Sequence, residues 1–327
     1  MTSFDQVSGQ DFGGELCPEA LVIAQAFDDP NAPPVEQMDI NAARRTHALE
    51  AYDSPIACED TRVEDRQITV EERKLRVRIY TPQGDGPFPI LVFAHGGCWT
   101  FCSLDSHDCL CHDYAHHAQC VVVSVDYALA PEAPYPHGLN DFHDAVVWCF
   151  EHADEIHGDA ARIAVAGDSA GGNLSAVVAQ RLQHHPQIRL SLQLLIYPIC
   201  DAAQLTGGSL DRYASGYFFT RDVLAWTASL YTSAGYDAQH PEISPLHGAV
   251  SSKLAPALFI IAECDVLRDQ AVDYAQILRK AGVEVQCNYY RGVPHAFMAM
   301  AGALDLGQAA LQDSAQHLKQ AFSKTAL

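Results

Sequence analysis

The sequence predicts an α/β protein: a mostly parallel, twisted sheet of about eight strands with helices on both faces and a helical cap. Short apolar runs, typical of strands buried on both faces, alternate with longer amphipathic stretches along most of the chain. This alternation predicts strand–helix–strand units whose crossovers cover the sheet on both sides. An interval from 200 to 239, rich in aromatic residues, interrupts the alternation, and we expect it to form the cap together with the N-terminal segment.

The expected elements follow from these runs in chain order. Leader helices are expected within 18–54, antiparallel edge strands near 66–70 and 74–81, and a last helix at about 303–322. The expected parallel strands lie near 89–94, 120–125, 161–166, 189–196, 256–262 and 283–290. The resulting division is a cap segment at 1–54, a first core part at 55–200, a cap insertion at 201–240 and a second core part at 241–327. A chain of 327 residues suits one such core with additions better than two independent domains.

A buried strand stops abruptly at a serine between glycines, in the stretch from 165 to 172. The pattern G-x-S-x-G is typical of a strand–turn–helix in which the serine, here Ser169, lies on a strained tight turn with its hydroxyl facing a cleft. Gly167 and Gly171 leave room where the backbone folds back sharply. The N–H of Ala170, at the start of the next helix, can point at an oxygen bound beside the serine. Ser169 is therefore a candidate nucleophile.

A second glycine-containing loop follows the apolar strand expected at 89–94 and reads His-Gly-Gly-Cys-Trp. Glycines just past a central strand let backbone N–H groups approach a ligand closely. Gly96 and Gly97 are therefore candidates to bind an oxyanion together with Ala170. The alternative is that these two glycines only form a turn.

An acid and a histidine each follow a later strand. Asp265 comes just after the strand expected at 256–262, and His295 just after the one at 283–290. The chain order serine, acid, histidine is that of one group of hydrolases and differs from the orders in chymotrypsin-like and subtilisin-like proteases. Among sixteen histidines, the position after a strand singles out His295. Glu263 and Asp269 are competing acids, and Asp269 is expected to open the next helix instead.

Further motifs resemble the hormone-sensitive-lipase-like family of bacterial esterases. They are HGG at 95–97, VDYALAPE at 125–132, GDSAGG at 167–172, YP at 197–198, GYFFTRD at 216–222, SPL at 244–246, DVLRD at 265–269 and HAF at 295–297. The resemblance implies an α/β-hydrolase fold and a serine carboxylesterase that hydrolyses short- to medium-chain acyl esters without a cofactor or metal. Three residues depart from the family pattern: Cys98 replaces a third loop glycine, Ala128 a common arginine, and Ala296 a common glycine.

The roles that follow are those of an acyl-enzyme mechanism. His295 takes the proton of Ser169 and returns it to the leaving alcohol, and Asp265 orients the imidazole. Asp168 is expected to brace the neighbouring loop as a hydrogen-bond acceptor. We expect the substrate pocket to include Cys98, Trp99, Asp168, Tyr197, Tyr217 and Phe218.

Two other functions use the same residues differently. The loop from His95 to Trp99 also fits the HGGxW pattern of arylformamidases, which hydrolyse the formyl amide of kynurenine. Alternatively, the protein is a non-catalytic ligand receptor on this fold. Such receptors lose a member of the serine–acid–histidine set, whereas all three residues are present here.

Composition restricts the partners. A net charge of −21 argues against nucleic acid and anionic membrane surfaces. The expected partner, a small-molecule ester, is what the resemblance to the esterases implies. The N-terminus has no basic start or apolar segment, so the eleven cysteines are expected to be reduced thiols of a cytoplasmic protein. The Cys and His residues between 98 and 117 lack paired C-x-x-C spacing, so no metal site is expected. The strand at 283–290 is expected at a sheet edge, where a homodimer contact with the following helix would protect it.

Overall fold

The computed structural model describes residues 4–27, 33–46, 61–70 and 72–325. Within these ranges the strands form one nine-stranded sheet in the order β1-β9-β8-β7-β6-β4-β5-β3-β2. The strands are β1 (Gln6–Ser8), β2 (Arg62–Val70), β3 (Arg73–Thr81), β4 (Phe88–Ala94), β5 (Val121–Val125), β6 (Gly158–Asp168), β7 (Leu190–Ile196), β8 (Ala257–Cys264) and β9 (Val285–Pro294). All neighbours are parallel except the pairs that β3 makes with β2 and β5. The predicted α/β fold is confirmed.

The burial of each strand explains its sequence pattern. Every residue of β5 and β8 is buried, as expected for apolar strands covered on both faces. In β2, by contrast, exposed and less exposed residues alternate, because this edge strand packs on one side only. The central strands are therefore fixed by packing on both faces, and the residues that follow them are held in defined positions.

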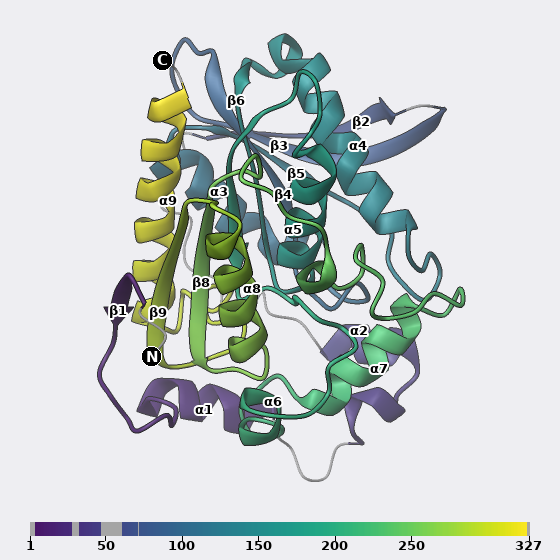
Figure 1. Cartoon of the computed structure of the whole chain (residues 1–327), viewed down its shortest axis with the longest axis vertical. Helices are drawn as coiled ribbons and strands as arrows, with labels where there is room; N and C mark the ends of the chain where they lie inside the picture. The colour runs from purple at the N-terminus through teal and green to yellow at the C-terminus, as the bar shows by residue number, and fades with distance from the viewer. Residues whose placement is uncertain (1–3, 28–32, 47–60, 71, 326–327) are drawn as a thin grey trace.

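Helices cover both faces of the sheet (Figure 1). On one face, α4 (His137–Glu151) and α5 (Ala170–Leu182) pack on β6, and α8 (Arg268–Lys280) packs on β8. On the other face, α3 (Asp108–Ala118) packs on β5, and α9 (Asp305–Thr325) packs on β6 and β7. No helix in the described ranges is both long enough and apolar enough to cross a membrane.

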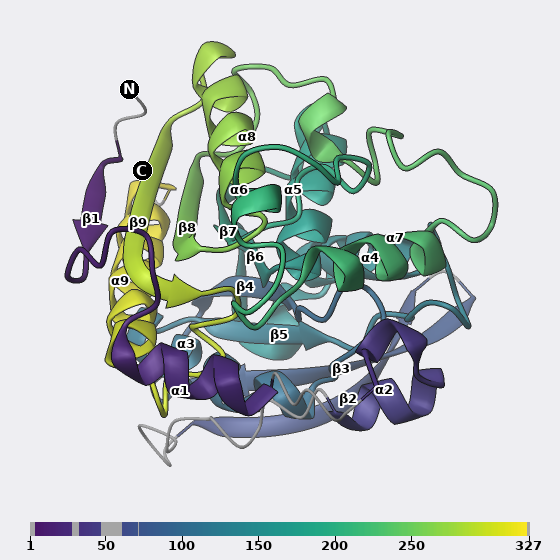
Figure 2. The same cartoon turned by 90° about the horizontal axis from the view of Figure 1, so that it is seen from below.

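A further set of helices gathers at one end of the sheet (Figures 1 and 2). It comprises α1 (Pro18–Phe27), α2 (Ile40–Thr46), α6 (Ser209–Arg212) and α7 (Arg221–Tyr231). The N-terminal part contacts the insertion directly: Tyr217 donates a hydrogen bond to Glu15 Oε2 at 2.6 Å, and Phe27 meets Phe218 edge-on with ring centroids 4.7 Å apart. The expected leader helices thus include α1 and α2, while residues 28–32 and 47–60 lie outside the described ranges.

The expectation that the last strand forms a free edge was wrong. The short strand β1 pairs with β9 in parallel, with Gln6 opposite Asn288 and Ser8 opposite Tyr290. Just before it, the N–H of Asp5 donates to the carbonyl oxygen of Cys287 at 3.0 Å. The N-terminal segment of the same chain therefore covers this part of β9.

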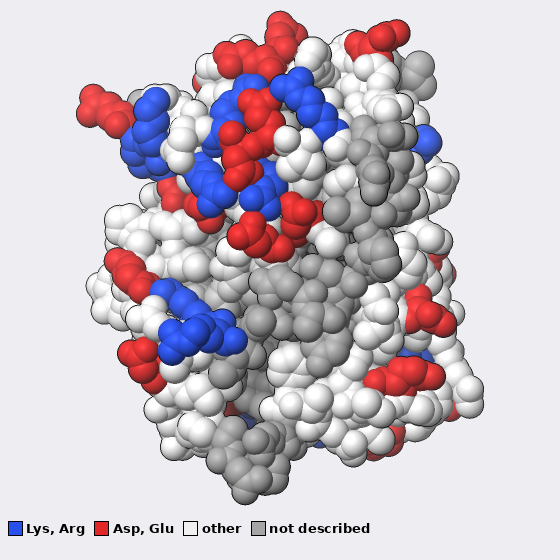
Figure 3. Space-filling model, turned by 180° about the vertical axis from the view of Figure 1, so that it is seen from behind, with Lys and Arg blue, Asp and Glu red and all other residues white. Residues whose placement is uncertain are grey.

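Arginine side chains concentrate on β2 and β3, where the surface shows basic and acidic residues side by side (Figure 3). Arg76 and Arg78 both bind Asp65, with nitrogen–oxygen distances of 2.5 and 2.6 Å. Arg73 contacts Asp141 and Asp144 of α4. The positive charge on this face is thus compensated locally by carboxylates.

Candidate active site

Ser169 lies at the tight turn between β6 and α5. Its φ of 55° and ψ of −115° are strained for a residue with a side chain. The turn is possible because its neighbours are small: a Cβ atom on Gly171 would overlap the carbonyl oxygen of Ala94, and one on Gly167 would overlap the backbone of Gly171. The sequence therefore folds this segment so that the serine hydroxyl projects from the carboxyl end of a central strand.

Three side chains from different strand ends form one hydrogen-bonded chain. Ser169 Oγ lies 2.9 Å from His295 Nε2, and His295 Nδ1 lies 2.7 Å from Asp265 Oδ2. All three residues are buried. The other carboxylate oxygen of Asp265 accepts the N–H of Leu267 at 2.8 Å, which fixes the carboxylate plane. The three residues singled out by their positions after strands are thus brought together.

The competing acids are engaged elsewhere. Glu263 Oε2 accepts the N–H of Gly292 at 2.9 Å, so it braces the backbone of β9. Asp269 lies in the first turn of α8 and accepts the N–H of Ser209 at 2.8 Å. Neither carboxylate has a recorded contact with His295 within the described residues.

Two aromatic rings hold the imidazole of His295. Phe219 stacks on it with ring centroids 4.6 Å apart, and Tyr197 meets it edge-on at 4.8 Å. Phe219 comes from the segment between α6 and α7, and Tyr197 directly follows β7. Phe219 was not among the residues predicted from the sequence, although it stands beside Phe218 in the same motif.

The loop after β4 is oriented by two buried histidines. His95 Nδ1 lies 2.7 Å from the carbonyl oxygen of Gly96, and the N–H of Gly96 faces His107 Nε2 at 3.4 Å. A carbonyl oxygen only accepts, so His95 carries its proton on Nδ1. Because C=O and N–H point in opposite directions in a trans peptide, the N–H of Gly97 is turned away from His95.

The backbone N–H groups near Ser169 differ in what they face. The N–H of Gly96 faces the ring of His107. Within the described residues, the N–H groups of Gly97, Cys98 and Ala170 have no backbone acceptor. These three groups are therefore candidates to bind a substrate oxygen beside the serine.

Asp168 packs against the loop. A Cβ atom on Gly96 would overlap its carboxylate, so the glycine is needed for this close approach. Its Oδ1 lies 3.0 Å from His107 Nε2. Burial acts to raise the pKa of Asp168, but the neighbouring His107, with smaller contributions from His95 and His295, outweighs it, and the pKa is lowered.

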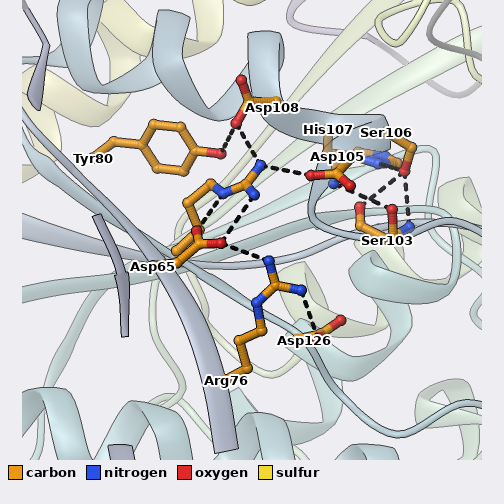
Figure 4. A network of polar contacts seen from close by, with 10 residues as sticks. Asp65, Arg76, Tyr80, Ser103, Asp105, Ser106, His107, Asp108 and Asp126 are labelled. Carbon is orange, nitrogen blue, oxygen red and sulfur yellow. Dashed lines mark hydrogen bonds and ion pairs between the residues drawn. The ribbon is translucent and has the colours of Figure 1, made fainter. Parts of the chain in front are cut away.

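Polar contacts extend from His107 to the surface of β2 and β3 (Figure 4). His107 Nδ1 lies 2.9 Å from Ser106 Oγ, which also accepts the N–H of Ser103 at 2.9 Å. The Ser103 hydroxyl accepts the N–H of Asp105 at 3.2 Å, and Asp105 pairs with Arg78 at 2.9 Å. The loop that faces the nucleophile is thus connected to the ion-pair cluster on the sheet edge.

A small pocket, partly open to solvent, lies beside the serine. Of the six residues expected to line it, Cys98, Asp168 and Phe218 do so. The pocket also takes side chains that the sequence analysis did not select: Phe101, Cys102, His107, Phe219, Val223 and Ala296. The wall is mainly apolar, and Asp168 and His107 are paired with each other within it.

The other three expected pocket residues lie outside this lining. Trp99 stacks in parallel on Tyr231 with centroids 4.4 Å apart and is buried. Tyr197 packs against His295, and Tyr217 points to Glu15. Each of these three side chains contacts other residues near the pocket and does not line it.

The Cys and His residues between 98 and 117 do not form a common centre. Within the described ranges, no three His, Cys, Asp or Glu side chains come together as metal ligands. Cys98 faces the pocket, and burial raises the pKa of its thiol to about 12. The thiol is therefore a neutral, weakly polar part of the pocket wall.

Known proteins resemble the chain over most of its length. A family model for the alpha/beta hydrolase fold matches residues 91–299. An ethyl acetate hydrolase of Pseudomonas putida is 38% identical over 278 residues, which are 83% of this chain and 87% of that protein. The carboxylesterase NlhH of Mycobacterium tuberculosis is 38% identical over 248 residues, 74% of this chain and 77% of that protein.

Solved structures agree with this. The crystal structure of a thermostable esterase from Pseudomonas putida superposes with a TM-score of 0.87 and 30% identity, covering 96% of this chain and 99% of that chain. The esterase of the archaeon Pyrobaculum calidifontis gives a TM-score of 0.85 and 34% identity, covering 94% and 98%.

The family match, which includes Ser169, Asp265 and His295, makes this chain an α/β-hydrolase. Its relatives narrow the class further, because they are carboxylic ester hydrolases that align with most of its length. The chain belongs to the hormone-sensitive-lipase-like group of esterases, which confirms the resemblance of its motifs.

Proposed function

We propose that the protein hydrolyses carboxylic esters with Ser169 as nucleophile, His295 as general base and acid, and Asp265 as the group that orients the imidazole. The observation that carries this proposal is the chain from Ser169 Oγ to His295 Nε2 at 2.9 Å and from His295 Nδ1 to Asp265 Oδ2 at 2.7 Å, beside an apolar pocket. His295 removes the serine proton as Oγ attacks the ester carbonyl, then protonates the leaving alcohol. Water repeats the same steps on the acyl-enzyme.

The oxyanion of the tetrahedral intermediate is bound, we propose, by the N–H groups of Gly97, Cys98 and Ala170. Gly96, also a candidate from the sequence, packs against Asp168, and its N–H faces His107. Each donor of such a site contributes roughly 10²–10³ in rate. Because a backbone N–H is used, the thiol of Cys98 has no chemical part in this step.

The preferred substrates in this proposal are uncharged esters with short to medium acyl chains. A small pocket with a mainly apolar wall suits a small acyl group. The similar Pseudomonas putida protein is named an ethyl acetate hydrolase. We expect the highest kcat/KM for p-nitrophenyl esters at about C2–C8, where added methylenes stop contributing once the pocket is filled.

A chain-length series tests this proposal, with N-formylkynurenine assayed alongside. An optimum at about C14 or longer would contradict the pocket argument. Preferential hydrolysis of N-formylkynurenine would favour the arylformamidase alternative. Trp99, the residue that suggested it, stacks on Tyr231 outside the pocket lining.

Homodimerisation and a cytoplasmic location remain proposals of ours. The free-edge argument for a dimer is weakened, because β1 covers part of β9, so a contact at this end would use the uncovered part of β9, β1 or α9. Light scattering tests it: a mass near 35.6 kDa at micromolar concentration would contradict a dimer. Buried thiols such as Cys111 and Cys120 support a reducing compartment, which fractionation of expressing cells tests.

A further inference from the structure

The loop that carries the proposed oxyanion donors is held in an unfavourable backbone conformation. Cys98 and Trp99 have φ values of 52° and 56°, so two consecutive residues with side chains lie in the left-handed region. Such conformations are unfavourable for residues with side chains and persist only where their surroundings enforce them. The contacts that hold this segment are therefore of functional interest.

Inside the loop, one turn connects the donors to the following residues. The carbonyl oxygen of Gly97 accepts the N–H of Thr100 at 2.9 Å and that of Phe101 at 2.7 Å. The carbonyl oxygen of Trp99 accepts the N–H of Ala130 at 2.8 Å. The directions of the N–H groups of Gly97 and Cys98 therefore depend on where Thr100 and Ala130 lie.

Arg44 of α2 binds both of these places. Its Nε donates to the carbonyl oxygen of Thr100 at 2.9 Å, and its Nη2 donates to that of Ala130 at 3.0 Å. The same guanidinium binds Glu132 with two parallel hydrogen bonds of 2.8 and 2.7 Å. This side-chain hydrogen bond lowers the pKa of Glu132. The side chain of Arg44 thus connects the backbone at Thr100 with the backbone at Ala130.

We propose that Arg44 is a positioning residue for the reaction: from the N-terminal cap segment it holds the strained Cys98–Trp99 turn and so aligns the N–H groups of Gly97 and Cys98 with the oxyanion. Glu132 fixes the orientation of the guanidinium. The inference rests on the proposed function. Its consequence is that the N-terminal segment contributes to the chemical step through Arg44.

Arg44→Gln tests the proposal. The variant keeps a donor but loses the planar fork that reaches two carbonyls and a carboxylate at once. We expect kcat for p-nitrophenyl acetate to fall by roughly 10- to 100-fold with KM changed by less than about threefold, because misaligned donors affect the transition state most. Arg44→Lys is expected to fall between Arg44→Gln and wild type. Arg45→Gln, on the exposed neighbouring residue, is the matched control and should leave both constants unchanged.

Chemical rescue separates positioning from general stability. In Arg44→Ala, ethylguanidinium at tens of millimolar should restore kcat several-fold, whereas ethylammonium at the same concentration should not, since only a guanidinium can bridge the carbonyls. If Arg44 variants do not fold, Glu132→Gln decides instead, with an expected loss of several-fold in kcat.

The possible failures are distinguishable. Titration with an organophosphate first establishes whether wild-type Ser169 is labelled, and absence of labelling would count against the proposed function itself. Once labelling is established, the inference would be overturned if folded Arg44→Gln kept the wild-type kcat or showed only a rise in KM. If the Arg44 variants do not fold, a wild-type kcat in Glu132→Gln would overturn it. Equal rescue by ethylammonium would overturn it as well.

Discussion

His95 Nδ1 and the carbonyl oxygen of Gly96 lie 2.7 Å apart, and this contact fixes the direction of the next amide. The ring of His95 stacks on Tyr127 with centroids 4.4 Å apart, and the Tyr127 hydroxyl donates to the carbonyl oxygen of His95 at 2.8 Å. These contacts hold the imidazole of His95 against the carbonyl oxygen of Gly96. The N–H of Gly97, on the opposite side of the same peptide group, therefore points away from His95.

Burial of His95 predicts a pH dependence of stability. Desolvation is the main cause that lowers its pKa to about 4, against 6.5 for the ordinary side chain. Between these values the unfolded chain takes up a proton that the folded protein does not, so this contribution to the free energy of unfolding is complete above about pH 6.5. It falls as the pH drops, with a loss of about 3 kcal/mol at pH 4.

His95→Asn provides the measurement. The amide can donate from nearly the same position but does not titrate, so the free energy of unfolding, measured by denaturant between pH 4 and 6.5, should depend less steeply on pH by about one proton. The exposed His184→Asn is the control and should keep the wild-type slope. Equal slopes for wild type and His95→Asn would show that His95 does not titrate in this way.

Ser169→Ala should abolish ester hydrolysis while the fold is retained. The hydroxyl is the only covalent nucleophile in the proposed mechanism, so we expect kcat to fall by more than about a thousandfold. An organophosphate should label wild type once per chain and leave the variant unlabelled. Substantial residual turnover in a preparation free of contaminating esterase, or labelling of the variant, would assign the nucleophile elsewhere.

Asp265→Asn and Glu263→Gln should separate the two neighbouring acids. The amide in Asp265→Asn lacks the charge and permits the wrong imidazole tautomer, so we expect kcat to fall roughly 10³- to 10⁴-fold. The amide oxygen in Glu263→Gln could still accept the N–H that Glu263 now accepts from Gly292, so kcat should stay within a few-fold of wild type. Steady-state kinetics at matched thermal stability decides between them, and equal losses would make the choice of Asp265 wrong.

The strands were predictable because most of them are buried on both faces and therefore apolar throughout. The strand β1 was not, because Gln6–Ser8 has three mostly polar residues and no periodicity. Its pairing depends on Asn288 to Tyr290, far along the chain. A contact of this kind exists only once the sheet has formed, and the free edge inferred for β9 failed for that reason.

Some site residues could be predicted from the sequence, and others depend on contacts that form only in the folded protein. Ser169, Asp265 and His295 were predictable because each follows a strand, and parallel strands bring their carboxyl ends to one edge of the sheet. The proposal of Cys98 as an oxyanion donor could not be made from the sequence, because it depends on how His95 and His107 are placed around the peptide groups of the loop. Trp99 was expected in the pocket from its place in the loop, but its side chain stacks on Tyr231 instead.

Phe218 should set the upper limit of acyl-chain length. It lines the pocket, has a φ of 75°, and is backed by Phe27 of α1 at a centroid distance of 4.7 Å, so its ring forms a wall between the pocket and the N-terminal segment. Phe218→Ala removes that wall and should move the optimum in a p-nitrophenyl ester series by two or more carbons toward longer chains. The kcat/KM for the acetate should fall by several-fold, because a short acyl group loses apolar contact.

Tyr217→Phe is the matched control for Phe218→Ala. This neighbouring substitution removes only the hydroxyl that donates to Glu15, outside the pocket lining, so the chain-length profile should stay as in wild type. An unchanged profile in Phe218→Ala, with the variant folded, would mean that Phe218 does not limit the pocket. A shift of the same size in Tyr217→Phe would instead attribute the limit to the contact between the N-terminal segment and the cap insertion.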